Sequence, residues 1–216
     1  MSGKTPVNIP LYRIVHWQNV EHILHHGLCC VGHPEANPTF INIGHQQLIT
    51  DRHTHPITQL PDAGNLGEYV PFYFGPFSPM LLMIKNGTPP VQKRPQEDIV
   101  YIISSVKTIK DAGLEYCFTD RQAKRKLAGF YRDDEKFEKI DWEVVGLQQW
   151  HNTRDYQDRM ERKQAEFLIR HHVPVSCINW LGVRNEERKR YFEEMIARLG
   201  LTIQVFLDAK NQLYYP

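Results

Sequence analysis

The segment ERKQAEFLIR, residues 161–170, contains the sharpest change of pattern in the chain. A charged, helix-favouring run ends at Gln164-Ala165-Glu166, and the apolar residues 167–169 that follow are typical of a half-buried strand. Side chains alternate along a strand, so we expect Gln164 and Glu166 to project from the same face. Such an amide–carboxylate pair is suited to hold a sugar hydroxyl or to face a developing positive charge. A solvated pair at a strand end is the plain structural alternative.

Length and composition limit the classes of protein. The 216 residues predict one domain, spanning residues 1–216, with a sizeable core. The formal net charge of +1 gives no overall field that attracts nucleic acid, so such binding depends on a local basic patch. No apolar run approaches the roughly 20 residues of a membrane span, and the N-terminus lacks a signal-peptide pattern. The four cysteines form no disulfide framework, which predicts a cytoplasmic protein without a membrane partner.

Two histidine-rich segments invite a metal interpretation. His25, His26 and His33 flank the adjacent pair Cys29-Cys30, and a His-x-His pair occupies residues 53–55. Adjacent cysteines are poor joint ligands, and the usual zinc spacings are absent. We therefore predict no metal site.

Hydrophobic periodicity predicts an α+β protein. Apolar or alternating runs predict strands at residues 11–15, 69–74, 99–103, 115–118, 178–181 and 202–207, with Pro71 at an edge or bulge. Helical spacing and end signals predict helices at residues 17–27, 79–84, 105–113 and 186–199, an exposed charged helix within 133–158, and a basic helix opening at Thr119-Asp120. The irregular alternation favours antiparallel sheets over a doubly wound fold. Neither the G-x-G-x-x-G nor the P-loop motif is present.

Two basic features have alternative interpretations. Arg13 stands among apolar residues of the first strand. Burial of its charge costs free energy unless an anion pairs with it, which suggests an anionic ligand; a structural ion pair or an exposed guanidinium is the alternative explanation. Lys124 and Arg125 precede the aromatic pair Phe130-Tyr131, a combination suited to single-stranded nucleic acid because cations meet phosphates and rings stack on bases. A solvated basic helix face explains the same residues equally well.

Four blocks of sequence together resemble one known family. They are Tyr12-Arg13-Ile14, the run from Val70-Pro71-Phe72-Tyr73-Phe74 to Ser78-Pro79-Met80-Leu81, Phe118-Thr119-Asp120-Arg121, and Lys163-Gln164-Ala165-Glu166-Phe167-Leu168. With these blocks the chain resembles the DarT toxins, DNA ADP-ribosyltransferases of bacterial toxin–antitoxin systems, from about Pro10 to the Tyr214-Tyr215 tail. The resemblance implies an ADP-ribosyltransferase-like fold, in which two packed, mainly antiparallel sheets with flanking helices surround an NAD cleft.

The resemblance also implies an activity and partners. The family transfers ADP-ribose from NAD, a co-substrate, to a base in single-stranded DNA and releases nicotinamide. The base is thymidine in one branch and guanosine in another, and we expect thymidine here. A macrodomain-type antitoxin is the implied protein partner. The alternatives that stay open are transfer to guanosine, RNA or protein, and a non-catalytic module that binds single-stranded nucleic acid.

The family's functional residues fall on identifiable positions. Its catalytic glutamate falls on Glu166 and its essential arginine on Arg52, while many relatives carry histidine at the position of Arg13. The implied NAD contacts are Tyr12, Arg13, Ile14, Tyr73 and Arg52. The implied contacts to the DNA substrate are Gln164, His53, His55, Tyr69, Phe77, Lys124 and Arg125.

The residue types agree with the implied chemistry. Breaking the nicotinamide–ribose bond creates oxocarbenium-like charge, which a carboxylate at Glu166 stabilises. Arg52 stays protonated, so it is suited to steady a diphosphate or to polarise the acceptor base rather than to remove a proton. Gln164 is placed to orient the base.

Overall fold

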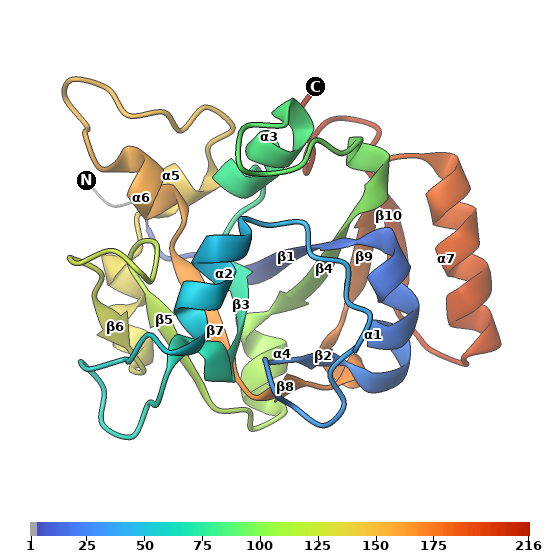
Figure 1. Cartoon of the computed structure of the whole chain (residues 1–216), viewed down its shortest axis with the longest axis horizontal. Helices are drawn as coiled ribbons and strands as arrows, with labels where there is room; N and C mark the ends of the chain where they lie inside the picture. Colours follow the sequence, from blue (N-terminus) through green and yellow to red (C-terminus); the bar gives the residue numbers. More distant parts are fainter. Residues whose placement is uncertain (1–3) are drawn as a thin grey trace.

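Strands and short helices follow one another along residues 4–216, the part of the chain that this computed structural model describes (Figure 1). The first three residues of the expected 1–216 domain lie outside it. The strands are β1 (Pro10–His16), β2 (Leu28–Cys29), β3 (Tyr69–Tyr73), β4 (Ile99–Ser105), β5 (Tyr116–Thr119), β6 (Phe130–Tyr131), β7 (Glu166–Arg170), β8 (His172–Val173), β9 (Trp180–Val183) and β10 (Gln204–Leu207). The α-helices are α1 (Val20–His26), α2 (Gln46–His53), α3 (Pro79–Asn86), α4 (Val106–Asp111), α5 (Trp142–Gly146), α6 (Arg159–Lys163) and α7 (Glu186–Arg198).

Most of the strands belong to one large sheet. Its order is β10-β9-β4-β1-β3-β7-β5-β6, and β2 pairs with β8 in a separate two-stranded sheet. Within the large sheet only β9 and β10 run parallel, in the part of the chain described. The predicted α+β class with mainly antiparallel strands is confirmed, and the two sheets are very unequal in size.

The large sheet splits between β1 and β3. β1 pairs with β4 over its whole length, from Pro10↔Ser105 to His16↔Ile99, whereas within the described residues its register with β3 consists of Tyr12↔Tyr73 alone. Pro71, which has no N–H to donate, lies on β3 beside the split. The strand edge predicted at Pro71 is therefore the gap between β1 and β3 and not the outer edge of the sheet, because β3 is an interior strand in the sheet order.

The helix ends follow the predicted capping chemistry. The side chain of Ser78 accepts from Leu81 N–H at the start of α3, and Asn185 accepts from Arg188 N–H at the start of α7. Gly27 ends α1 with a φ of 77°, a conformation that glycine adopts without strain.

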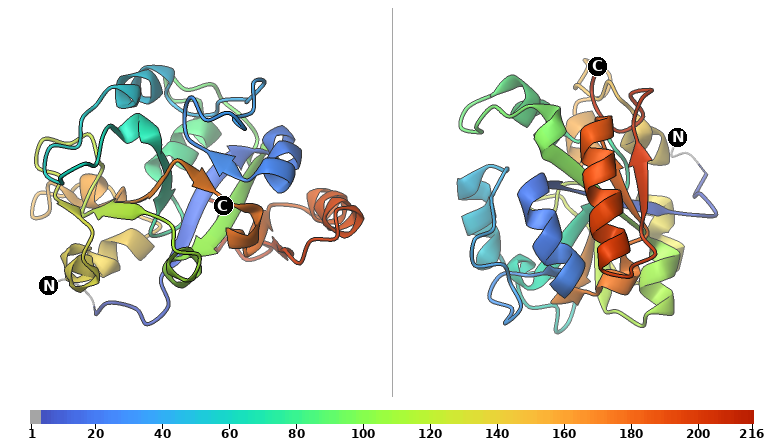
Figure 2. Two further views of the ribbon diagram at one scale, coloured as in Figure 1. Left: turned by 90° about the horizontal axis from the view of Figure 1, so that it is seen from below. Right: turned by 90° about the vertical axis from the view of Figure 1, so that its right-hand side faces the viewer.

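Helices and the C-terminal residues cover the two sides of the sheet (Figures 1 and 2). The larger apolar cluster joins one side to α1 and α7 through buried residues such as Ile23 and Phe192. A second cluster joins α3 to the C-terminal residues, with Leu81, Ile84 and Tyr214 at its centre. These two layers fix β1 and β3 in place on either side of the split.

The basic helix expected from Thr119-Asp120 does not form. Thr119 ends β5, and residues 120–129 make a chain of turns before β6. Two carboxylate side chains accept from N–H groups of this segment. Asp120 accepts from Gly129 N–H at 2.9 Å, and Glu166 accepts from Ala123 N–H at 2.9 Å. The prediction failed because these carboxylates compete with helical hydrogen bonds.

The exposed charged helix expected within residues 133–158 is also wrong. The segment contains a 3-10 helix at Asp134–Lys139 and the five-residue α5, joined by irregular chain. Phe137, Val145 and Trp150 are buried, so the charge alternation concealed core positions. Asp141 caps α5 by accepting from Val144 N–H, which separates the two helical pieces.

Candidate active site

Glu166 is a buried carboxylate at the start of β7. Its side chain is 2% exposed, and its Oε2 lies 2.8 Å from Nη1 of Arg52 on α2. Its Oε1 accepts from Ala123 N–H at 2.9 Å and from Arg52 Nη1 at 3.2 Å. The backbone N–H of Glu166 donates to the hydroxyl of Thr119, which in turn donates to the carbonyl of Arg121. Two groups therefore hold the carboxylate in one orientation, and Thr119 holds the backbone that carries it.

Tyr73 faces Glu166 across the sheet. The two residues are direct partners in the antiparallel pair of β3 and β7, so their side chains lie on the same face. Burial, and then the charge of Glu166, raises the pKa of Tyr73 to about 12. The phenol therefore stays neutral and can donate a hydrogen bond at physiological pH.

Arg13 spans the split in the sheet. Its Nη1 donates to the carbonyl of Pro71 at 2.8 Å, which joins β1 to β3 where their backbones separate. Burial, and then the neighbouring Arg52, lowers the pKa of Arg13 to about 10, so the guanidinium stays charged near neutral pH. An arginine here is thus both a bridge between strands and a buried positive charge.

A pocket of about 610 Å³ lies over this split. Its walls come from β1, β3, the end of α1, the segment 27–46 and α2, and Arg13, Arg52, Tyr73, Gln164 and Glu166 all line it. Helix α2 approaches closely because Gly67 has no side chain: a Cβ there would lie 2.7 Å from the Cα of His53. The pocket has the size and the few convergent polar groups of a small-molecule site.

Several cationic or polar donors in this pocket lack partners. Among the buried side-chain atoms of residues 4–216 without a hydrogen bond are Nε of Arg13, Nη2 of Arg52 and Nε2 of His53, and all three residues line the pocket. Buried donors are normally satisfied, so three at one site indicate an anionic ligand. A dinucleotide diphosphate fits this donor set.

Residues 12–215 match the family described as ssDNA thymidine ADP-ribosyltransferase, DarT. A DNA ADP-ribosyl transferase of Escherichia coli O127:H6 is 34% identical over 204 residues, which cover 94% of this chain and 93% of that protein. The chain belongs to the DarT family.

Solved structures agree with this assignment. The DarT of Thermus sp. 2.9 in complex with ADP-ribosylated ssDNA has a TM-score of 0.88 to this chain, with 29% identity over 100% of both chains. The same DarT in complex with NAD+ has a TM-score of 0.82, with 30% identity over 98% of this chain and 100% of that chain. The resemblance found in the sequence, the fold and the enzyme class, an NAD-dependent DNA ADP-ribosyltransferase, are confirmed.

The structure of this DarT-family chain brings most of the expected NAD contacts together. Arg13, Ile14, Arg52 and Tyr73 line the pocket, as does the catalytic candidate Glu166. Tyr12 does not, because its ring packs edge-to-face on Tyr101 with 6.2 Å between centroids.

The expected DNA contacts are divided. Gln164 and His53 line the pocket, whereas His55, Phe77, Lys124 and Arg125 do not. Gln164 belongs to the end of α6 rather than to a strand, and its Nε2 donates to Met160 O at 3.0 Å. Strand alternation is therefore not what places Gln164 beside Glu166.

Two aromatic candidates are core residues. Tyr69 borders the pocket, but it is 3% exposed and its hydroxyl donates to Ala63 O at 2.9 Å. Phe77 is buried against Tyr215 in the second apolar cluster. Phe77 is therefore away from the pocket, and Tyr69 contributes to its wall with a hydroxyl that already has a partner.

The two basic candidates already have acidic partners. Nζ of Lys124 lies 2.8 Å from Asp51 of α2, and Nε of Arg125 lies 3.2 Å from Glu161 of α6. These pairs fasten the 120–129 segment to α2 and α6, so a structural role accounts for both cations.

Sequence reasoning missed three residues of the site. Gln122 lines the pocket and donates through Nε2 to Gln164 Oε1 at 3.4 Å. Thr119 holds the backbone of Glu166, and buried Lys163 donates to the carbonyls of Pro76 and Val145. Thr119 and Lys163 lie inside the quoted family blocks, which was the available signal; Gln122 lies just outside them.

Two further findings concern metals and membranes. Residues 4–216 contain no group of three or more His, Cys, Asp or Glu side chains placed to hold a metal ion. Over the same residues, no helix has both the length and the apolar character needed to cross a bilayer.

Proposed function

We propose that this chain transfers the ADP-ribosyl group of NAD to the base of thymidine in single-stranded DNA, with Glu166 as the catalytic carboxylate. The observation that carries the proposal is that Glu166, although 2% exposed, forms part of the pocket wall and is fixed there by Arg52 and Ala123 N–H. The family match, whose description names thymidine in ssDNA, supports the acceptor.

Arg13, Ile14, Tyr73 and Arg52 are the residues that would hold NAD. NAD supplies an ADP-ribosyl group whose ribose carbon gains positive charge as nicotinamide leaves. The unpaired donors of Arg13 and Arg52 suit the diphosphate, since guanidinium groups bind such anions strongly. A DarT of Thermus sp. 2.9 that is similar over its whole length has been solved in complex with NAD+.

Glu166 supplies the negative charge that the reaction needs. A fixed, buried carboxylate stabilises positive charge on the ribose carbon more strongly than it would in water. Arg52 holds this carboxylate in place and keeps its own charge throughout. The thymine ring nitrogen bonds to the ribose carbon as the bond from that carbon to nicotinamide breaks, and the proton of the ring nitrogen passes to solvent water; Arg52 helps by polarising the base.

Gln164 and Gln122 orient the acceptor. Their side-chain amides lie together on the pocket wall near Glu166, and an amide both donates and accepts hydrogen bonds. Thymine likewise offers a ring N–H donor flanked by carbonyl acceptors. A single-stranded substrate avoids the cost of extracting the base from a duplex.

Three broader features belong to the same proposal. The chain acts in the cytoplasm, it consists of one domain over residues 1–216, and a macrodomain-type antitoxin opposes it. The last feature is what the resemblance to the toxins of toxin–antitoxin systems implies.

Mass spectrometry of oligonucleotides tests the proposal. A single-stranded oligonucleotide with one thymidine is incubated with NAD, beside otherwise identical strands with guanosine or with no thymidine. The expected result is one ADP-ribosyl adduct on the thymidine strand and release of nicotinamide. Adducts on the guanosine strand alone, on RNA or on added protein would contradict the proposed acceptor.

A further inference from the structure

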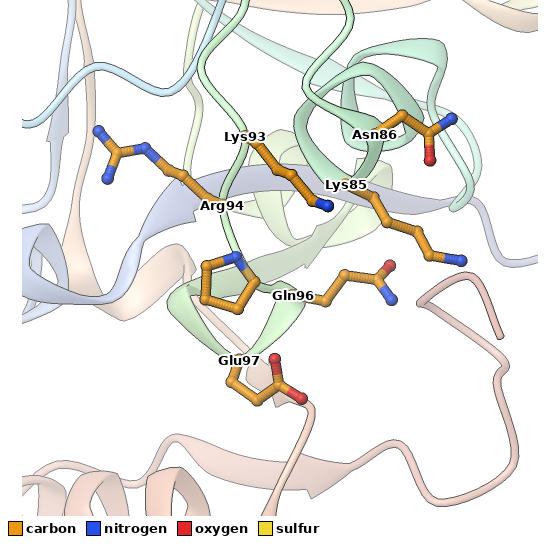
Figure 3. Close-up of a pocket in the computed structure, with 7 residues that line it drawn as sticks. Lys85, Asn86, Lys93, Arg94, Gln96 and Glu97 are labelled. Atoms are coloured by element: carbon orange, nitrogen blue, oxygen red, sulfur yellow. The ribbon is translucent and has the colours of Figure 1, made fainter.

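A second concave surface lies at the far end of α3. It is an open groove of about 880 Å³ lined by Lys85, Asn86, Lys93, Arg94, Pro95, Gln96 and Glu97. Figure 3 shows the Lys85 and Lys93 side chains extending in the same direction, with Gln96 and Glu97 below them and Arg94 extending to the other side of the loop. Three cations and one acid give this surface, the basic groove, a local positive charge that the whole chain lacks.

The groove has a fixed backbone. The loop after α3 turns back at Gly87, whose φ is 68°, and a Cβ at Gly87 would lie 2.7 Å from Cβ of Lys93. The N–H of Arg94 donates to Ile84 O at 3.1 Å. Buried Gln96 exchanges two hydrogen bonds with the backbone of Tyr215. The cations are therefore presented by an anchored loop.

Two of the three cations of the groove are not neutralised internally. Lys85 is held by the backbone oxygen of Pro216 at the end of the chain, whereas Arg94 donates to the neutral amide of Gln92 at 3.2 Å. Among residues 4–216 neither Arg94 nor Lys93 forms an ion pair with a carboxylate, in contrast to Lys124 and Arg125 beside the pocket. Unpaired cations are available for a ligand.

Helix α3 contributes to both the NAD pocket and the basic groove. Met80 in the first turn of α3 lines the pocket, and Lys85, five residues later on the same helix, lines the groove, a rise of about 7.5 Å along α3. Ile43 of the pocket wall and Val91 of the groove loop belong to one apolar cluster. A strand that leaves the pocket along α3 would therefore lead to the groove.

We propose that the basic groove, formed by Lys85, Lys93 and Arg94, binds the phosphates of single-stranded DNA that flanks the target base. This inference rests on the proposed function, because it assumes that the acceptor is DNA. Each phosphate contact releases condensed counterions, so binding there strengthens with strand length and weakens with salt. The groove supplies affinity without sequence selectivity.

The test compares two matched Lys-Arg pairs. Lys93→Ala with Arg94→Ala removes two cations of the groove, and Lys189→Ala with Arg190→Ala removes a second Lys-Arg pair, on α7, that lines neither site. Each variant and the wild type label an oligonucleotide of about 20 nucleotides and a trinucleotide centred on the target thymidine. Lys85 stays intact because it contacts Pro216.

For the groove variant we expect kcat/KM on the long strand to fall about tenfold. A plot of log kcat/KM against the logarithm of salt concentration should also become shallower by about 1.4, because two phosphate contacts are lost and each contributes about 0.7 to the slope for a single strand. Labelling of the trinucleotide and all activities of the α7 variant stay within about twofold of wild type. An unchanged long-strand rate, or an equal fall on the trinucleotide, would overturn the inference. Failure of the proposed function is distinguishable, because the wild type would then label neither strand.

Discussion

Nη1 of Arg52 lies 2.8 Å from Oε2 of Glu166, although 114 residues separate them in the chain. One residue comes from α2, which covers the pocket, and the other from the first position of β7 in the sheet beneath. This ion pair therefore holds a helix with no fully buried residue of its own onto the carboxylate that we propose to be catalytic. The position of α2 and the orientation of Glu166 depend on each other.

Arg52→Met is expected to destabilise the fold by about 3 kcal/mol, because it leaves Glu166 as a buried charge without a counterion. Adding Glu166→Gln to this variant removes the charge and should restore part of the loss. Urea denaturation of the wild type, both single variants and the double variant measures the coupling. Strictly additive effects would show that the two side chains do not interact.

Thr119→Val is expected to cost about 1–3 kcal/mol, because it removes the acceptor of Glu166 N–H inside a fully buried site and the donor to Arg121 O. It should also lower kcat, since residues 120–129 include the Ala123 N–H that holds the carboxylate. Thr119→Ser keeps the hydroxyl and is the control. A wild-type kcat in Thr119→Val, or a loss in Thr119→Ser as large as that in Thr119→Val, would contradict the role given to the hydroxyl.

The sequence predicted the parts of the site that lie on regular elements. Apolar patterning predicted the two strands that carry Glu166 and Arg13. The family blocks predicted that both residues line one pocket. The turns at residues 120–129 were not predictable from helical patterning, because Asp120 within the segment and the distant Glu166 each accept from one of its N–H groups. Gln122 was missed for the same reason: only the turned segment brings it to Gln164.

The same limit explains Phe77. It stands in an aromatic run that suggested a stacking surface, but contact with Tyr215 near the other end of the chain places it in the core. Contacts between residues so far apart in sequence leave no local signal.

Lys163 predicts a pH dependence of stability. Burial lowers the pKa of its amine from 10.5 to about 7, so between those values the unfolded chain binds more protons than the folded one. The free energy of unfolding should therefore rise with pH across this window, by up to about 1.4 kcal/mol per pH unit, relative to Lys163→Met. Denaturation at several pH values measures the difference. A difference that stays flat or falls as pH rises would contradict the buried placement of Lys163.

Arg13→Met is expected to weaken NAD binding about tenfold, because it removes a buried positive charge from the pocket and the bridge to Pro71 O. The thermal shift on NAD titration reports this loss as a higher NAD concentration for the same rise in Tm. Arg190→Ala, on the exposed face of α7, is the control and should titrate like the wild type.

The most direct test of the account is the labelling of a thymidine-containing single strand with tagged NAD by Glu166→Gln. This change keeps the shape of the side chain and an acceptor for Ala123 N–H but removes the negative charge. We predict a fall in kcat of about 10²- to 10³-fold or more, with a folded protein by circular dichroism. Labelling at the wild-type rate would show that the carboxylate of Glu166 is not the catalytic group.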